Sequence, residues 1–211
     1  MIEICAIVKN ENDYLDEWVN YHLNKVDRIV IYDNGSITKW VTNNSKVILK
    51  EWLEKYGQLN CYQTHARETD ADWTAFIDID EFLIGDIREL IDKNNDYDAI
   101  QMRWVRIGAD GQVKKEIGGV MERFKTPTPC QDANYGFKII AKPKKIKRFI
   151  NPHDVLVEGK KIITREIIIN HYFTKSYEEW CKKRDRGRVD CSIIATDGEF
   201  FTHNPDMINK I

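Results

Sequence analysis

The sequence predicts an α/β fold with a mixed central sheet and a C-terminal helical appendage. Apolar stretches at residues 2–8 and 28–32 flank a helical pattern, and a later apolar stretch ends in clustered acids at residues 78–81. Ser176, followed three residues later by Glu179, forms a capping-box pattern at the start of a helical tail. Because a strand, a helix and a strand joined at this spacing form a right-handed βαβ unit, the first half should build a parallel sheet.

The elements follow one another in the order that this fold requires. Residues 2–8 (IEICAIV) predict the first strand, and Leu15, Trp18 and Val19 then recur at helical spacing. Asn12 or Asp13 can cap that helix. Further strands are predicted at residues 28–32, 47–49, 73–78, 98–107, 137–141 and 162–169, and helices at 51–56, 63–72 and 87–91.

The acids at the end of the predicted strand at residues 73–78 are the most informative feature of the chain. Asp78 and Asp80 are two residues apart and share one face of an extended strand, whereas Glu81 points to the other face. Like charges on one face repel unless they are neutralised, and a hard divalent cation is the usual partner of paired carboxylates. Because ligands of open α/β sheets bind at strand ends, we expect Mg²⁺ or Mn²⁺ and a nucleotide diphosphate here. The alternative is that these acids cap the next helix.

Composition limits the class of protein. The chain has 211 residues, of which 42% are hydrophobic and 31% charged, enough for one substantial core. A formal net charge of −2 gives no general attraction to nucleic acid. The odd, widely spaced cysteines favour neither a zinc site nor a disulfide framework and indicate a reducing compartment. They are Cys5, Cys61, Cys130, Cys181 and Cys191.

No apolar run reaches the roughly 18–20 residues of a membrane span, and no basic region precedes an apolar stretch at the N-terminus. We therefore expect a cytoplasmic protein. Two basic runs, at residues 142–148 and 182–188, are either solvated faces or sites for anions. As anion sites they could hold a pyrophosphate leaving group or make peripheral contact with the inner face of the cell membrane.

Several strings resemble a known group of enzymes. They are CAIVKNENDYLDEWVNYH, IYDNGS, WTAFIDIDEFL, ERFK, FKIIAKP and NHYFTKSYEEW with the trailing RGR. Their order is similar to that in GT-A glycosyltransferases, which have a Rossmann-like nucleotide-diphospho-sugar transferase fold, and more closely to family 92 and the related family-2-like enzymes. The resemblance covers roughly residues 4–190, although the chain is short between Tyr32 and Trp73.

The resemblance implies a domain organisation. Residues 1–175 would form the GT-A catalytic domain, with a nucleotide-binding half at 1–85 and an acceptor half at 86–175. Residues 176–211 would form a helical tail packed on that domain.

The resemblance also implies donor-binding residues. The residues that would frame the base and ribose are Val8, Lys9, Asn10, Glu11 and Asp33. Arg67, in the pair Ala66-Arg67, would lie near the nucleotide, and Lys175 would close over the diphosphate. The alternatives are a solvated turn for Lys9 and Glu11 and a surface salt bridge for Arg67.

For the metal, the resemblance makes Asp80 the first ligand, with Asp78 contacting the ribose or reaching the ion through water. Among the histidines, His171 is the best placed, because it ends a strongly apolar strand. His153 is the rival ligand or an acceptor-site residue. A histidine ligand would favour Mn²⁺ over Mg²⁺.

Glycosyl transfer with inversion also requires a carboxylate to take the proton of the acceptor hydroxyl. The candidate bases are Asp110, Glu122, Asp132 and Asp154, among which the sequence does not choose. Glu122 could equally form a structural ion pair with Arg123. The side chains that could stack on sugar faces are Trp104, Phe124, Tyr135 and Tyr172.

The expected function is therefore metal-dependent transfer of a hexose from a nucleotide sugar to a glycan or lipid-linked glycan acceptor in cell-surface polysaccharide or lipopolysaccharide synthesis. By analogy with family 92, UDP-galactose is the first expectation for the donor. One alternative is a nucleotide-sugar-binding or glycan-binding module of the same fold without turnover. Another is a metal-dependent nucleotidyltransferase or phosphatase, although no phosphate-cradling glycine motif supports it.

Overall fold

The computed structural model describes residues 1–129, 136–187, 192 and 195–211, and its strands form one large sheet and one hairpin. The strands of the sheet are β1 (Ile2–Val8), β2 (Arg28–Asp33), β3 (Val47–Glu51), β4 (Trp73–Phe76), β5 (Glu81–Ile84), β6 (Ala99–Arg106), β7 (Phe137–Ala141) and β10 (Lys161–His171). Within the described residues their order across the sheet is β3-β2-β1-β4-β7-β6-β10-β5. The hairpin pairs β8 (Ile146–Asn151) with β9 (Asp154–Val157).

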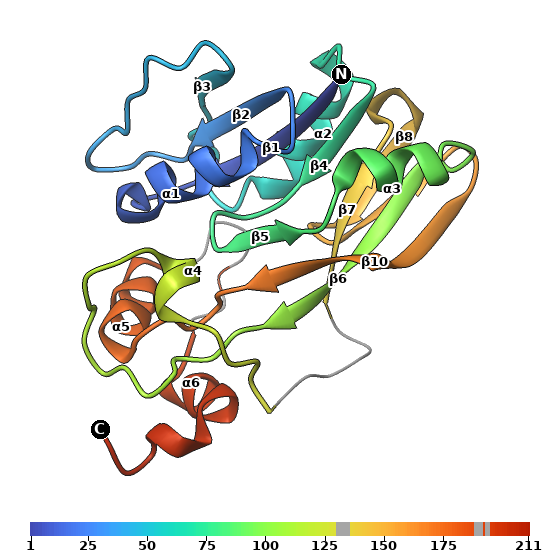
Figure 1. Ribbon diagram of the computed structural model, residues 1–211. Coiled ribbons are helices and arrows are strands. Elements are labelled where there is room, and N and C mark those ends of the chain that lie inside the picture. The colour runs from blue at the N-terminus through green and yellow to red at the C-terminus, as the bar shows by residue number, and fades with distance from the viewer. Residues whose placement is uncertain (130–135, 188–191, 193–194) are drawn as a thin grey trace.

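The helices lie on both faces of the sheet and at its end (Figure 1). They are α1 (Asn12–His22), α2 (Gln58–Glu68), α3 (Ile87–Lys93), α4 (Val120–Arg123), α5 (Tyr177–Arg186) and α6 (Asp197–His203), with short 3₁₀ turns η1 (Pro143–Lys145) and η2 (Pro205–Met207). The predicted α/β class, with a mixed central sheet and a helical C-terminal appendage, is confirmed. No helix in the described part of the chain is long and apolar enough to cross a bilayer.

The sheet is mixed because its two halves pair differently. β1 is parallel to β2 and to β4, and β2 is parallel to β3, with Val8 opposite Asp33. β7 lies between β4 and β6 and is antiparallel to both. The carboxyl ends of the parallel strands therefore meet at one edge, where ligands bind in open α/β sheets.

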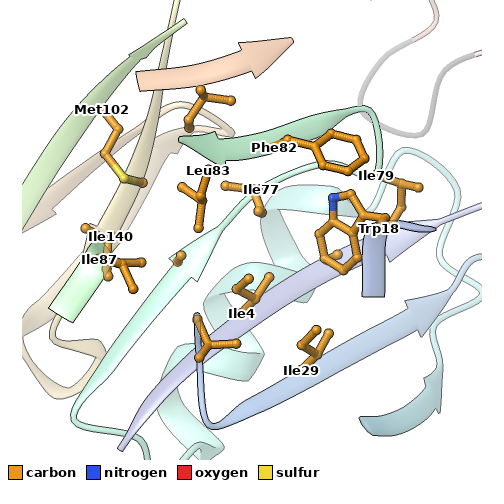
Figure 2. Close-up of a cluster of buried hydrophobic side chains, with 14 of the residues drawn as sticks. Ile4, Trp18, Ile29, Ile77, Ile79, Phe82, Leu83, Ile87, Met102 and Ile140 are labelled. Atoms are coloured by element: carbon orange, nitrogen blue, oxygen red, sulfur yellow. The ribbon is translucent and has the colours of Figure 1, made fainter. Parts of the chain in front are cut away.

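Alternation along β1 divides the core into two layers. Ile4 and Ala6 pack with residues of α1 and α3 on one face of the sheet, in the cluster that Figure 2 shows around Trp18. Cys5 and Ile7 point to the other face and pack with residues of α2 and of the β8–β9 hairpin. Because successive side chains of a strand point to opposite faces, burial of every residue of β1 requires a layer on each side.

Some local predictions are wrong. The helix expected at residues 51–56 does not form: Glu51 is instead the last residue of β3, where it pairs with Asp33, residues 52–54 have no regular structure, and Tyr56 has a left-handed φ of 56°. α2 instead begins at Gln58, five residues before the predicted start at Gln63. The N-cap of α1 is Glu11, without a side-chain hydrogen bond, rather than Asn12 or Asp13. The short elements β5, β8, β9 and α4 were not predicted.

The alternative role for the acids at residues 78–81 can also be decided. The residue that caps α3 is Asp86, whose carboxylate accepts hydrogen bonds from the backbone N–H groups of Arg88 and Glu89. The acids at 78–81 therefore do not cap the next helix.

The C-terminal tail is helical, as predicted, and α5 begins with the predicted capping box between Ser176 and Glu179. Trp180 of α5, Phe200 of α6 and Met207 of η2 form a small apolar cluster with Ala109, which follows β6. Figure 1 shows this tail beyond the ends of β6 and β10, at the opposite end of the molecule from β3. The division at residue 175 into a catalytic domain and a tail remains a prediction.

Candidate functional site

A cleft of about 270 Å³ lies at the edge of the sheet beside the acid turn. The turn contributes Asp78 and Asp80, β10 contributes His171, and the tail contributes Lys183 and Glu199. The cleft therefore brings together residues that are more than a hundred positions apart in the sequence.

The backbone of the acid turn explains how the acids are oriented. β4 ends at Phe76, a turn follows, and β5 begins at Glu81, whose carboxylate accepts a hydrogen bond from the N–H of Asp78 at 2.8 Å. The carbonyl of Asp80 accepts a hydrogen bond from the N–H of Tyr172 at 2.8 Å. This turn directs Asp78 and Asp80 to the cleft, while Glu81 is fully buried behind them.

Lys138 neutralises the first acid. Its Nζ atom, which is fully buried, lies 2.7 Å from Oδ2 of Asp78 and 3.6 Å from Oε2 of Glu81. Gln58 Nε2 also donates a hydrogen bond to Oδ1 of Asp78, at 2.8 Å. Burial acts to raise the pKa of Asp78, but the ammonium of Lys138 outweighs it and lowers the pKa. Burial raises the pKa of Glu81 well above its ordinary value, which favours the protonated form.

Asp80 is paired with a cation of the tail and faces a histidine. Lys183 Nζ lies 2.7 Å from Oδ2 of Asp80, and His171 Nε2 lies 3.5 Å from Oδ1. Burial acts to raise the pKa of Asp80, but Lys183 and His171 together hold it well below its usual value. Burial lowers the pKa of His171, which favours the neutral ring that a metal ligand requires.

These side chains fit a divalent cation that takes few protein ligands. Within the described ranges no group of three or more histidine, cysteine or acidic side chains is arranged to hold a metal ion. The pair Asp80 and His171 provides one carboxylate and one imidazole, and two metal–ligand bonds of about 2.1 Å span their 3.5 Å separation. A metal bound by this pair would take its remaining ligands from water and substrate. The metal role of Asp78 remains a prediction.

Lys175 is a buried cation beside this pair. It is only 4% exposed, its φ is 56°, and its Nζ lies 4.4 Å from the centre of the Tyr14 ring. Among the described residues its ammonium has no ion pair, and burial lowers its pKa. It faces a second cavity of about 560 Å³, which shares Glu11, Lys183 and Arg186 with the main cleft. Strained backbone at such a position is typical of functional sites.

Of the residues predicted to frame the base and ribose, Asn10 and Glu11 line the second cavity, and Lys9 lines none of the three cavities. The other two line a third cavity, of about 200 Å³. Val8 and Asp33 line it together with Trp40. Lys39 Nζ lies 2.7 Å from Oδ2 of Asp33, and the N–H of Ser36 donates to Oδ1 at 2.8 Å. Burial acts to raise the pKa of Asp33, whereas Lys39 and Ser36 lower it.

The loop after β1 is fixed by the tail. Arg186 lies 2.7 Å from Oε1 of Glu11 and donates a hydrogen bond to the carbonyl of Lys9 at 3.0 Å. Asn10 Oδ1 accepts a hydrogen bond from the N–H of Ile37 at 2.8 Å. Glu11 is therefore not a solvated residue. Arg67 is exposed at the end of α2 and lines none of the three cavities.

Three of the four candidate bases lie outside the main cleft. Asp110 accepts hydrogen bonds from two backbone N–H groups, those of residues 125 and 126. Glu122 is exposed on α4, and Asp154 is paired with Lys161. The fourth candidate, Asp132, lies outside the described residues.

The predicted sugar-stacking aromatics are divided between the cleft and the core. Trp104 lines the main cleft, with its ring centre 4.5 Å from that of His171 and 5.0 Å from that of His153, which lines the cleft as well. Phe124 and Tyr172 are buried in the hydrophobic core, so their proposed stacking on sugars is wrong. Tyr135 lies outside the described residues.

The sequence did not predict which two lysines pair with the acids of the cleft. Lys138 is the second residue of the apolar strand β7, where a buried lysine signals an internal acidic partner, and that signal was available in the string FKIIAKP. Lys183 belongs to the basic run of the tail, but its pairing with Asp80 depends on tertiary structure.

The structure thus has an open α/β sheet with a charged cleft at its strand ends, the place where ligands bind in proteins of this class. Over residues 4–197 the sequence matches the family model described as Glycosyltransferase family 92. The chain therefore belongs to glycosyltransferase family 92, and the resemblance recognised in its sequence is confirmed.

The sequence identity to an individual member of the family is low. A glycosyltransferase family 92 protein of Oryza sativa subsp. japonica is 28% identical over 217 residues, which cover 88% of this chain and 35% of the relative. The chain thus spans about a third of the length of that curated relative.

Two solved structures are similar to the chain at 13% identity. S. aureus TarS 1–349 in complex with UDP has a TM-score of 0.47, covering 67% of this chain and 46% of TarS. HddC from Yersinia pseudotuberculosis has a TM-score of 0.49, covering 86% of this chain and 97% of HddC.

Proposed function

We propose that this chain is a metal-dependent glycosyltransferase that moves a hexose from a nucleotide sugar to a glycan acceptor with inversion. The observation that carries this proposal is the pair Asp80 and His171, 3.5 Å apart at a strand-end cleft and close to the buried ammonium of Lys175. A carboxylate, a neutral imidazole and a buried cation together form a site for a metal-bound diphosphate.

The base and ribose of the donor would occupy the edge where β1 and β2 end. Asp33 and Val8 line the cavity there, and a strand-end carboxylate accepts hydrogen bonds from a uracil N–H or from ribose hydroxyls. Lys138 and Gln58 donate hydrogen bonds to Asp78. The part of the Asp78 carboxylate that faces the cleft can accept hydrogen bonds from ribose hydroxyls. Arg67 has no role in this arrangement.

The diphosphate would lie between the acid turn and the tail. Asp80 and His171 would hold the Mn²⁺ or Mg²⁺ ion. Lys175, and Lys183 once it is released from Asp80, would neutralise the phosphate oxygens. When bound, the cation supplies Lewis-acid stabilisation of the negative charge that develops on the leaving nucleoside diphosphate.

For substrates we propose UDP-galactose as the donor and a glycan or lipid-linked glycan as the acceptor, by analogy within the family. Trp104 at the cleft wall supports a sugar acceptor, because an apolar aromatic ring can pack against the face of a hexose. We also propose that the glycan formed belongs to a cell-surface polysaccharide or lipopolysaccharide.

A thermal-shift screen of nucleotide sugars with and without Mn²⁺, followed by an assay of UDP release, tests this proposal. A ligand that binds only the native state raises the melting temperature. We expect a rise with UDP-galactose that requires the metal, and metal-dependent release of UDP.

The alternatives predict other results. Binding without UDP release, even with a panel of sugar acceptors, would indicate a binding module. Turnover of nucleoside triphosphates or phosphomonoesters in place of nucleotide sugars would indicate a nucleotidyltransferase or phosphatase.

A further inference from the structure

The main cleft contains a carboxylate that no cation of the described residues neutralises. Four acidic side chains line the cleft among the residues that the structure describes, and three of them are paired at 2.7 Å. These pairs are Glu11–Arg186, Asp78–Lys138 and Asp80–Lys183. The fourth acid is Glu199, whose carboxylate has neither an ion pair nor a hydrogen bond to any described residue. Its lone pairs are therefore available to a ligand.

The helix that carries Glu199 is held firmly against the rest of the tail. Thr196 caps α6 by accepting a hydrogen bond on its side chain from the N–H of Glu199. The next residue, Phe200, is fully buried, with its ring centre 5.2 Å from that of Tyr177 and 5.9 Å from that of Trp180. Glu199 thus projects into the cleft from a packed element, as a catalytic group requires.

Ring contacts connect this helix to the proposed metal pair. His203, one turn after Glu199, has its ring centre 5.5 Å from that of Phe173. The Phe173 ring centre lies in turn 5.3 Å from that of His171. Glu199 and His171 therefore belong to one continuous wall of the cleft.

We propose that Glu199 is the catalytic base of the transfer reaction, an inference that rests on the proposed function. Its carboxylate takes the proton of the acceptor hydroxyl while that oxygen forms a bond to the anomeric carbon. The bond between the anomeric carbon and the β-phosphate oxygen breaks, and its electron pair leaves with the nucleoside diphosphate. Attack and departure occur on opposite sides of the anomeric carbon, so the configuration is inverted.

The position of the tail suits this role. The donor would extend from the ends of β1 and β2 to Asp80, and Figure 1 shows α6 at the opposite end of the molecule from β3. A base for an inverting reaction must lie on the acceptor side, away from the leaving group. The carboxylates of Glu11, Asp78 and Asp80 are each engaged by a cation at 2.7 Å. Among the described acids of the cleft, only Glu199 has a carboxylate that is not engaged in this way.

The test compares Glu199→Gln with the unaltered chain in the hydrolysis of UDP-galactose with Mn²⁺ present, where water replaces the acceptor. Glutamine keeps the shape of the side chain but cannot take a proton. We expect UDP release to fall by about 10²- to 10⁴-fold, while the Kd for UDP changes by less than about threefold. Glu199→Asp should keep part of the activity, because it retains the carboxylate. Glu116→Gln, which changes an exposed glutamate outside the cleft, is the matched control.

Several outcomes would overturn the assignment. UDP release by Glu199→Gln within about threefold of the unaltered chain would exclude Glu199 as the base. Loss of turnover in His153→Asn, with turnover kept in Glu199→Gln, would make His153 the base instead. If the unaltered chain neither binds UDP nor turns over any nucleotide sugar, the proposed function itself fails. Unchanged UDP affinity in Glu199→Gln shows that the variant is folded, so its loss of turnover then has a chemical cause.

Discussion

Replacement of Lys138 by methionine tests the charge balance behind the acid turn. Lys138 is fully buried, with its Nζ 2.7 Å from Asp78 and 3.6 Å from Glu81. Methionine fills a similar volume without the charge, so the variant leaves the Asp78 carboxylate without its cation. Breaking a buried ion pair by removal of one partner costs about 3–5 kcal/mol of unfolding free energy. For a chain of this length, such a loss lowers the melting temperature by roughly 10 °C.

The loss should depend on pH in a definite direction. In the unaltered chain the pKa of Asp78 is lowered below 3.8, so its contribution to stability is fully present above that pH and is lost as the pH falls further. Without Lys138, burial raises the pKa of Asp78 in the folded state, so the folded variant takes up a proton as the pH falls. The difference in unfolding free energy should therefore be largest near pH 7 and shrink towards about pH 4.

Urea denaturation of both chains at several pH values measures this difference. The control is Lys145→Met, because Lys145 is 48% exposed and pairs with the exposed Glu158 at 2.9 Å. An exposed pair contributes only about 0–1 kcal/mol, so the control should change little. A loss below about 1 kcal/mol in Lys138→Met, or a loss that does not vary with pH, would refute this account of the acid turn.

Two further predictions concern ionisable groups of the tail. Glu179 forms a buried ion pair with Arg123 at 2.7 Å, and despite its burial the partners of Glu179 lower its pKa to about 2. Glu179→Gln should lower the free energy of unfolding by about 3–5 kcal/mol at neutral pH. The difference between the two chains should narrow as the pH falls from 4.5 to about 2. A difference in denaturation midpoints that stays constant over this pH range would contradict this prediction. Burial, with a smaller effect from Arg106, lowers the pKa of His203 from 6.5 to about 4. The free energy of unfolding should therefore decrease as the pH falls from 6.5 to about 4. In an NMR titration the ring signals of His203 should not shift above about pH 5, and a midpoint near 6.5 would be incompatible with the buried neutral ring.

The sequence predicts best those features that depend on local patterns. The apolar run before Asp78 identified a buried strand, and the spacing of Ser176 and Glu179 identified the start of α5. Both patterns involve residues close together in the sequence, so they can be recognised without knowledge of the tertiary structure. The helix expected at residues 51–56 shows the limit of such signals, because Glu51 pairs with Asp33 of the neighbouring strand, a contact that local composition does not indicate.

The site was predicted less completely, because its electrostatics arise from distant pairs. Lys183 and Asp80 are separated by 103 positions in the sequence, and Lys138 and Asp78 by 60. The string FKIIAKP indicates that Lys138 has an internal acidic partner, but the residue pattern does not indicate which carboxylate Lys138 or Lys183 reaches. The free carboxylate of Glu199 was missed for the same reason, since its significance depends on the pairing of the other acids in the cleft.

The binding of UDP with and without Mn²⁺, measured by calorimetry for the unaltered chain and for Asp80→Asn, tests the central claim most directly. Asparagine keeps the shape of the side chain but removes the charge that would bind the cation. We expect tight binding of UDP only with Mn²⁺ and only in the unaltered chain. Equal affinity without the metal, or an Asp80→Asn variant that binds UDP and Mn²⁺ as well as the unaltered chain, would contradict the claim that Asp80 holds a metal-bound diphosphate.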